Sequence, residues 1–496
     1  MEALATGIQV VFQPGTLVLM VAGVVAGIVV GAIPGLTATM AMALMTPFTF
    51  AMSSGVAISV LLAIYVGAIS GGLISAILLK IPGTPSSITT TFDGFPMARR
   101  GLAGQALGTA IISSFIGGAI SFVVLMLVSP QLARFALKFG PHEYFAVGIL
   151  GLSTIVSIGG NSPIKGLIAG AFGLLLATVG LDVVTGIPRF TFGVVELTSG
   201  FDFVAVLIGL FAISQVLTDI ENIYRKTEVG AKIGNLFPSL SELKRNVTNF
   251  LRSGLIGTWI GVLPGAGGSI ASLMAYDQAK RFSKTPEKFG TGFVDGIVAS
   301  ETANNAVIGG ALIPLLTLGI PGDTPAAVLL AALTLHGLQP GPLLYRTNPE
   351  VFQTVFISLC VANLMMILIE MAGIRVFIKI LRIPKYILLP LIVGMCVVGS
   401  YSINNRFLDV WTMFGFGVLG YLMEKHGFPV APTVLGVVLG PMIEGEFRRA
   451  LFISRGNLAS FITRPISAAV LVLTVVMLVL PRLRSQRGGA RGTRCA

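Results

Sequence analysis

Long apolar runs separated by short polar stretches fill almost the whole of this 496-residue chain. A membrane-spanning helix needs roughly 20 mostly apolar residues, and the pattern accommodates about ten to twelve such spans. The candidate spans are Leu17–Phe50, Val56–Thr91, Gln105–Val128, Phe145–Ile158, Gly166–Leu181, Phe203–Leu217, Gly254–Tyr276, Ala303–Leu335, Val351–Gly373, Ile387–Ser400, Val410–Met423, Val430–Ile443 and Ile466–Leu480. The pattern therefore predicts an all-α integral membrane protein.

Four of these apolar runs are interrupted by Pro-Gly pairs at corresponding places in two halves of the chain. The string G-x-x-x-G-x-x-P-G occurs over 27–35 and again over 257–265, and Ile81–Pro85 in the first half corresponds to Ile320–Pro325 in the second. Backbone that leaves a helix at membrane depth must be satisfied by protein or by an aqueous cavity. Interrupted segments in corresponding halves are typical of a transporter's substrate site. The sequence thus predicts two repeats with broken helices or re-entrant hairpins, and a transporter.

The distribution of Lys and Arg indicates that the two repeats have inverted topology. No Lys or Arg precedes Lys80, whereas the polar stretch 219–250 is basic and is therefore expected in the cytoplasm. The mixed charges of 444–455 fit this topology poorly. The predicted organisation is a first membrane repeat over 1–218, a cytoplasmic linker over 219–250, a second repeat with additional spans over 251–480 and a basic cytoplasmic tail over 481–496.

Composition supports a membrane location and argues against nucleic acid as a partner. The chain is 54% hydrophobic and only 11% charged, whereas a soluble domain averages about 25% charged residues. Its net charge is +12, and the Lys and Arg residues are concentrated in short loops and in the tail, as the positive-inside rule predicts for cytoplasmic segments. The three cysteines are scattered and form no metal-binding spacing, and the Met1–Gln13 segment lacks the basic residues of a cleavable signal peptide.

The helix breaks supply the candidate substrate site. The N-terminal end of a half-helix carries partial positive charge and accepts anions, and glycine-rich backbone and hydroxyl groups add hydrogen-bond donors. The candidate substrate-binding residues are Pro34, Gly35, Lys80, Pro82, Gly83, Thr84, Ser86, Ser87, Gly265, Gly267, Gly268, Ser269, Pro321, Gly322, Asp323 and Thr324. Ordinary alternatives stay open: the hydroxyls can be helix caps, and Lys80 can reach toward a membrane interface.

Three residues are candidates for the coupling ion. Asn304 and Asn305 offer carboxamide oxygens to Na⁺, and Asp323 could carry a proton or help to hold Na⁺. Helix–helix hydrogen bonding by the asparagines and capping by Asp323 are the alternatives. No Walker string, dinucleotide fingerprint, His-Glu-x-x-His pair or nucleophile elbow occurs. We therefore expect no enzyme and no cofactor beyond a possible Na⁺, with a membrane channel or an intramembrane enzyme acting on a small anion as the alternatives.

Several long strings resemble the large membrane subunit of the tripartite tricarboxylate transporter family, a TctA-like permease. They are Gly31–Leu36, Ala76–Ser87, Thr91–Ala98, Gly261–Gly265, Glu301–Ala306, Ile313–Gly322 and His336–Pro342. The resemblance extends over roughly 15–480. It departs at three positions: Lys80 stands where the family commonly has Asn, Ser70 where it often has Tyr, and Asp323 where it often has a small neutral residue. The added charge of Lys80 favours a more anionic or differently placed substrate.

The resemblance implies ion-gradient-driven symport of a tri- or dicarboxylate across the bacterial inner membrane. It implies two protein partners, a small hydrophobic membrane subunit and a periplasmic solute-binding protein that delivers the substrate. It implies no ATPase, in agreement with the missing Walker string. Which carboxylate is carried, and whether Na⁺ or H⁺ drives it, are left open at this point.

Overall fold

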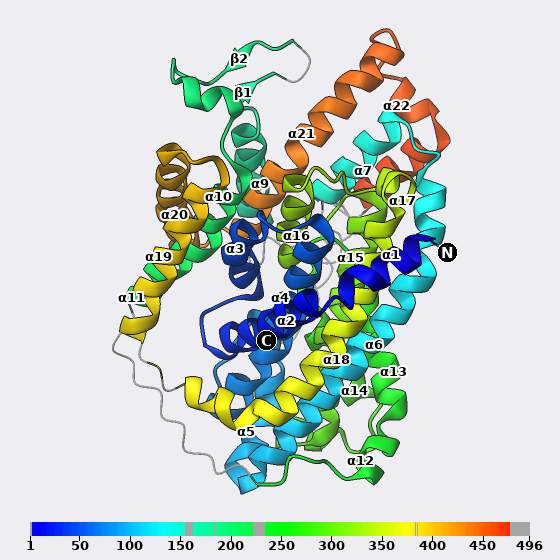
Figure 1. The fold of residues 1–496 in the computed structure, drawn as a ribbon. Helices are drawn as coiled ribbons and strands as arrows, with labels where there is room; N and C mark the ends of the chain where they lie inside the picture. Colours follow the sequence, from blue (N-terminus) through cyan, green and yellow to red (C-terminus); the bar gives the residue numbers. More distant parts are fainter. Residues whose placement is uncertain are drawn as a thin grey trace, which may run out of the picture. The chain divides into compact units, whose positions relative to one another are not determined.

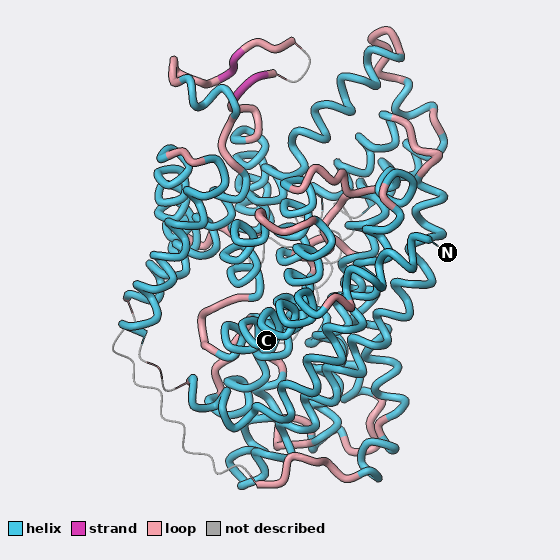
Figure 2. Tube along the Cα trace, viewed as in Figure 1, coloured by secondary structure: helices cyan, strands magenta, loops and turns pink. Residues whose placement is uncertain are grey.

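The computed structural model describes residues 2–153, 162–182, 185–221, 234–381, 383 and 385–476, and almost all of them are helical (Figure 2). The two short strands among these residues, β1 (Gly180–Leu181) and β2 (Pro188–Arg189), pair antiparallel. The expected basic tail over 481–496 and part of the expected linker, 222–233, lie outside the described residues.

The helices follow one another with short connections (Figure 1). The α-helices are α1 (Glu2–Val11), α2 (Pro14–Ala32), α3 (Ala38–Thr49), α4 (Ser54–Leu79), α5 (Thr90–Met97), α6 (Ala103–Ala136), α7 (Pro141–Ser153), α9 (Pro163–Leu176), α10 (Phe203–Leu207), α11 (Ser214–Ile220), α12 (Leu240–Arg245), α13 (Val247–Val262), α14 (Gly267–Arg281), α15 (Val294–Leu318), α16 (Thr324–Leu335), α17 (Pro342–Thr347), α18 (Pro349–Ile380), α19 (Lys385–Asn404), α20 (Phe407–Lys425), α21 (Val430–Ile453) and α22 (Ser460–Thr463). The shorter 3-10 and π turns are η1 (Pro85–Ser87), η2 (Ala98–Leu102), η3 (Val195–Ser199), η4 (Ile208–Ile213) and η5 (Pro286–Lys288).

Seven helical stretches in the described part of the chain are long and apolar enough to cross a membrane. They are Pro14–Ala32, Ser54–Leu79, Thr90–Ala136, Phe203–Ile220, Pro349–Ile380, Lys385–Asn404 and Val430–Ile453. The apolar part of α4 is entirely buried by other helices, whereas the others turn part of their apolar surface outward. This combination is that of a multi-pass all-α membrane protein, as the sequence predicts.

Backbone contacts rather than large side chains define how the central helices pack. A Cβ atom placed on Gly31 of α2 would lie 2.1 Å from the carbonyl oxygen of Ala68 in α4, and one placed on Gly261 of α13 would lie 2.6 Å from that of Val307 in α15. Small residues at four-residue spacing permit this approach between membrane helices. The α2–α4 and α13–α15 pairs are therefore packed in the same way.

The chain divides into two compact units. The first comprises Met1–Ala133 and Val204–Tyr421, and the second comprises Arg134–Phe203 and Leu422–Ala496. The first unit contains all four Pro-Gly positions that the sequence analysis singled out. In the second unit, α21 packs against α7 and α9.

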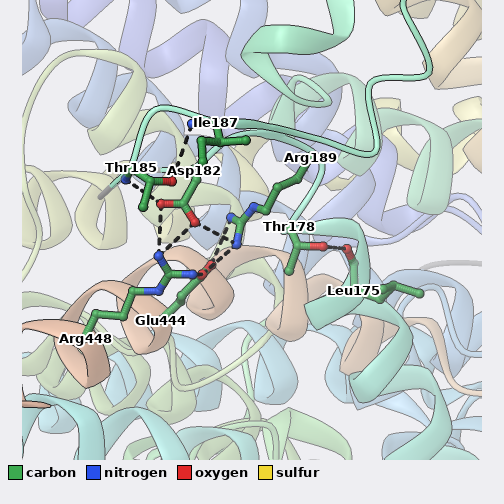
Figure 3. A network of polar contacts seen from close by, with 8 residues as sticks. All are labelled: Leu175, Thr178, Asp182, Thr185, Ile187, Arg189, Glu444 and Arg448. Carbon is green, nitrogen blue, oxygen red and sulfur yellow. Dashed lines mark hydrogen bonds and ion pairs between the residues drawn. The ribbon is translucent and has the colours of Figure 1, made fainter. Parts of the chain in front are cut away.

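In the second unit, a closed network of ion pairs joins α21 to the β1–β2 hairpin (Figure 3). Arg448 bonds to Asp182 at 2.8 Å and to Glu444 at 2.8 Å, and Arg189 bonds to Glu444 at 2.7 Å. The hydrogen bond to Glu444, with help from the charges of Glu444 and Asp182, raises the pKa of the Arg189 guanidinium. Two arginines and two carboxylates balance in this network. Of the charges in 444–455 that fit the expected topology poorly, Glu444 and Arg448 of α21 pair with the hairpin, and Glu446 and Arg449 pair with each other.

Candidate functional site

The second helix break of the first half meets the first helix break of the second half. The Ser272 hydroxyl of α14 donates to the backbone carbonyl of Ser86 at 3.0 Å, and it lies 3.2 Å from the Thr89 hydroxyl. A Cβ atom placed on Gly268 would lie 2.7 Å from the Cβ atom of Ser86. Because no side chain separates them, the start of α14 and the turn η1 lie directly against each other.

The other two breaks meet in a second, similar pair. The hydroxyls of Thr39 in α3 and Thr324 in α16 are 2.8 Å apart, and these two helices lie side by side (Figure 1). Tyr65 of α4 donates a hydrogen bond to the carboxylate of Asp323 at the start of α16. Each half of the chain thus supplies one helix start to each pair.

The second Pro-Gly turn of each half packs against the end of the first broken helix of the same half, α2 or α13. A Cβ atom on Gly83 would lie 2.1 Å from the Gly31 carbonyl oxygen, and one on Gly322 would lie 2.2 Å from the Gly261 carbonyl oxygen. The Gly265 amide also donates to the Gly322 carbonyl at 2.7 Å. Glycine is required at these turns because any side chain would overlap a backbone carbonyl.

The starts of the three longer helices in these pairs differ in how they are capped. Thr37 caps α3 by accepting from the Met40 amide at 3.1 Å, and Asp323 caps α16 by accepting from the Ala326 amide at 2.9 Å. The start of α14, at Gly267, has no side-chain cap. Its unoccupied N–H groups and partial positive charge are suited to an anion.

A polar group without a partner lies beside this uncapped helix start. Asn304 of α15 is fully buried, its amide faces the Glu301 carboxylate, and its carbonyl oxygen has no hydrogen-bond partner among the described residues. A Cβ atom on Gly268 would lie 2.7 Å from the Asn304 side-chain oxygen, so the carboxamide faces the start of α14. A buried carboxamide oxygen without a partner costs about 1–3 kcal/mol, and a bound ligand would remove that cost.

The hydroxyls predicted to bind substrate lie at the same place. Thr84 and Ser86 are buried, with their hydroxyl oxygens 3.1 Å apart, and the Ser87 hydroxyl donates to the Thr84 carbonyl at 2.8 Å. The stretch Gly265–Ser269 is partly exposed. The structure therefore brings together Thr84, Ser86, Gly268 and Asn304.

Other predicted site residues lie apart from that cluster. Lys80 is exposed, has left-handed backbone with φ 58°, and its ammonium lies 6.0 Å from the centre of the Phe95 ring. Gly35 lies beside α11, where an added Cβ atom would be 3.0 Å from the Asp219 carboxylate. Asp323 and Thr324 belong to the α3–α16 pair. The hydrogen bond from the Gly265 amide to the Gly322 carbonyl connects this pair to the first cluster.

Asn305 belongs to a buried polar cluster on the neighbouring turn of α15. Its amide donates to the Ser114 hydroxyl at 2.8 Å, and its carbonyl oxygen has no partner in the described chain. Glu301 accepts hydrogen bonds from Thr90 and from Ser114. No group of three or more His, Cys, Asp or Glu side chains among the described residues is placed to hold a metal ion.

Three residues at these sites are absent from the sequence-based candidates. Tyr65 and Ser272 carried no sequence signal, because their partners are 258 and 186 residues away. Glu370 did carry one: it is an ionisable residue within the apolar run Val351–Gly373, which is a reason to suspect function. It accepts a hydrogen bond from Ser70 at 2.6 Å.

A cavity in the second unit offers a different kind of surface. It has a volume of about 360 Å³, and Phe145, Leu174, Ile443 and Phe447 are among the residues that line it. Its one charged lining residue, Glu444, is paired with the two arginines of the network in Figure 3. The walls are apolar, so this cavity is not suited to a small anion.

Comparison with known proteins supplies a family and two relatives. Residues 17–435 match the family described as "Tripartite tricarboxylate transporter TctA family". A protein of Agrobacterium vitis named "Uncharacterized 52.8 kDa protein in TAR-I ttuC' 3'region" is 40% identical over 488 residues, which cover 98% of this chain and 97% of that protein. A second, "Uncharacterized protein in TAR-II ttuC' 3'region" of the same organism, is 40% identical over 234 residues, covering 47% of this chain and 97% of its own length. No solved structure matches this chain.

Proposed function

This chain belongs to the tripartite tricarboxylate transporter TctA family, and from that membership we propose that it performs secondary active uptake of a tri- or dicarboxylate. A Na⁺ or H⁺ gradient drives the uptake. A small hydrophobic membrane subunit accompanies the chain in the bacterial inner membrane, and a periplasmic solute-binding protein delivers the substrate. Membership of a transporter family supports a role as a transport component rather than an enzyme.

The observation that carries the proposal is the uncapped start of α14 beside the buried Asn304 side chain and the hydroxyls of η1. The N–H groups at Gly267–Ser269 bind one carboxylate group of the substrate. The hydroxyls of Thr84 and Ser86 donate from the opposite side. Charge-assisted hydrogen bonds of this kind are stronger than neutral ones, so a carboxylate is favoured over a neutral solute.

The same contacts support inverted repeats. The second Pro-Gly turn of each half packs on a glycine carbonyl of that half's first broken helix: an added Cβ atom would lie 2.1 Å from the Gly31 oxygen at Gly83 and 2.2 Å from the Gly261 oxygen at Gly322. The exchange of helix starts between the halves is what a two-fold relation in the membrane plane would produce. We propose that residues 1–218 and 251–480 contain these repeats, with 219–250 and 481–496 in the cytoplasm.

The coupling cation has two candidate positions in this proposal. The carbonyl oxygens of Asn304 and Asn305 are both buried without partners and are hard ligands suited to Na⁺. Asp323 is the other candidate, as a proton carrier between Tyr65 and the start of α16. A negatively charged substrate crosses a low-dielectric region at lower cost when a cation accompanies it.

Replacing Thr84 by Val tests the substrate site. Val has nearly the shape of Thr but no hydroxyl, so Thr84→Val should reduce uptake of radiolabelled citrate at least tenfold, the expected effect of losing a charge-assisted hydrogen bond worth about 1.5–3 kcal/mol. The measurement uses proteoliposomes that contain the chain and the small subunit, supplied with the binding protein, under an imposed Na⁺ or pH gradient.

Thr317→Val is the matched control. Thr317 is also buried, but its hydroxyl donates only to the Ile313 carbonyl of its own helix, so its loss should leave uptake within about twofold. Equal uptake by both variants and the unmodified chain would overturn the site. Uptake that neither saturates nor requires the binding protein would instead identify a channel, and conversion of the substrate would identify an enzyme.

A further inference from the structure

Two fully buried glutamates in the first unit have no basic partner. Glu301 of α15 and Glu370 of α18 are both 0% exposed, and their two helices bond to adjacent residues of α6, Glu301 to Ser114 and Asn363 of α18 to the Phe115 carbonyl. No ion pair joins either carboxylate to a Lys, Arg or His within the described chain. Two like charges that share a buried site cannot both remain ionised at low cost, so one of them must bind a cation or a proton.

Hydrogen bonds distinguish the two carboxyl groups. Both oxygens of Glu301 accept hydrogen bonds, one from Thr90 and the other from Ser114 at 3.2 Å. Glu370 accepts from Ser70 through Oε2, whereas its Oε1 is buried without any partner in the described residues. Donors stabilise the ionised form, so Glu301 is better satisfied as a carboxylate than Glu370, and the free oxygen of Glu370 is the place for a proton.

The other groups around Glu370 do not offer a competing charge. α18 packs against α1, α2, α4 and α17, and Asn363 bonds it to α6. α2 has no titratable residue, and Tyr65 of α4 donates to Asp323. The remaining titratable residues of these elements form no hydrogen bond or ion pair with Glu370 in the described structure: Glu2 of α1, Arg134 of α6, Tyr345 and Arg346 of α17, and Glu350, Cys360, Arg375 and Lys379 of α18 itself. Ser70 and Glu301 are thus the groups that act on it.

We propose that Glu370 is the proton-binding residue of the transport cycle. A proton from the outer solution binds Oε1 of Glu370, which makes the carboxyl neutral, and the same proton leaves to the cytoplasm after the substrate. This inference rests on the proposed uptake function and specifies its coupling ion. It differs from the Asp323 alternative because both oxygens of Asp323 already accept hydrogen bonds, from Ala326 and Tyr65.

Infrared difference spectroscopy of the purified full chain in lipid nanodiscs tests the inference without any substrate. Changing from acidic to alkaline buffer should remove the carbonyl-stretch band of a protonated buried carboxyl group. Glu370→Gln should abolish that change, because Gln keeps the shape and the Ser70 contact but cannot ionise. Glu350→Gln, in the first turn of the same helix, should preserve it. A band change in Glu370→Gln equal to that of the unmodified chain, or no band change in the unmodified chain, overturns the inference.

Glu370→Asp covers the case in which the Gln variant does not fold. It keeps an ionisable group but moves it by one methylene, so the band should shift in frequency. An unshifted band would assign the signal to another carboxyl group and overturn the inference.

Transport provides the second readout and separates the two proposals. In proteoliposomes with both partners, Glu370→Gln should retain exchange of external for internal citrate but lose accumulation driven by a pH gradient at least tenfold. Accumulation driven equally well by a pH gradient in this variant overturns the role of Glu370 and leaves the uptake function standing. If the unmodified chain takes up no carboxylate, the uptake function fails, and the infrared result still decides whether Glu370 binds a proton.

Discussion

At the scale of single residues, Gly83 and Gly322 have equivalent positions in the two halves. Each lies within a Pro-Gly turn, and each faces a backbone carbonyl that a Cβ atom would overlap, at 2.1 Å for Gly83 and 2.2 Å for Gly322. Backbone atoms of two packed helices cannot move aside as a flexible side chain can. These glycines are therefore needed for packing, whatever else the turns do.

Gly83→Ala and Gly322→Ala should each destabilise the protein by about 1–3 kcal/mol or more, because overpacking forces the helices apart. The measurement is thermal unfolding of the purified protein in detergent. Gly394→Ala is the control: no heavy atom lies within 4 Å of its added Cβ, and Ala favours helix over Gly by up to about 1 kcal/mol. An unchanged melting temperature in the first two variants would contradict the contact at the turns.

Individual residues also show what the sequence could and could not predict. Asp323 and Asn304 were recognisable because polar residues beside an apolar helix break are unusual. The partner of Asp323 was not, because Tyr65 is 258 residues distant and only the folded chain joins them. The sequence marks Lys80 by its charge. In the structure, Lys80 adopts left-handed backbone where α4 ends, and Gly319, with φ 73°, does the same where α15 ends.

At the scale of elements, the three longer helices that begin at the Pro-Gly breaks differ in their caps. α3 and α16 begin with a side chain that satisfies one of the first amides, and α14 does not. The sequence predicted where the helices break, because proline and glycine act locally. It did not predict which breaks meet, because Thr39 and Thr324 are 285 residues apart and their contact depends on tertiary packing.

Asp323→Ala should cost about 0.5–2 kcal/mol of stability through the lost cap of α16. Asp323→Asn keeps an acceptor for the Ala326 amide and should cost less than half as much. Thermal unfolding of the two variants side by side makes the comparison, with Thr37→Ala as a second capping variant at the start of α3. Equal melting of the Ala and Asn variants would mean that the charge of Asp323, rather than its role as a cap, supports the fold.

At the scale of the whole molecule, the two units have different chemistry. The first unit contains the helix-break pairs and the buried glutamates, whose charges are not balanced by basic residues. The second contains a balanced network in which Asp182 contacts both Arg189 and Arg448 (Figure 3). Sequence analysis predicted two membrane repeats in chain order, and it could not predict that segments 134–203 and 422–496 are grouped together, because that grouping joins distant parts of the chain.

Asp182→Asn should lower the stability of the second unit by about 1–3 kcal/mol, because the side chain is buried and two arginines lose its charge. The melting temperature of the purified protein measures this. Asp277→Asn is the control, since its ion pair with Arg281 is exposed and should contribute less than about 1 kcal/mol. Citrate uptake per folded molecule should be unchanged in both. A larger effect of Asp277→Asn would contradict the importance of the network.

The crossed pairing of helix starts also has a consequence for synthesis of the protein. While the ribosome makes the first half, η1 and α3 have no partner, since α14 and α16 begin only at Gly267 and Thr324. The polar starts of the early helices must then be sheltered by the insertion machinery or by water until translation has passed residue 324. The proposed binding site is thus complete only late in biogenesis, and we expect a chain that stops at the midpoint to be a target for quality-control proteases.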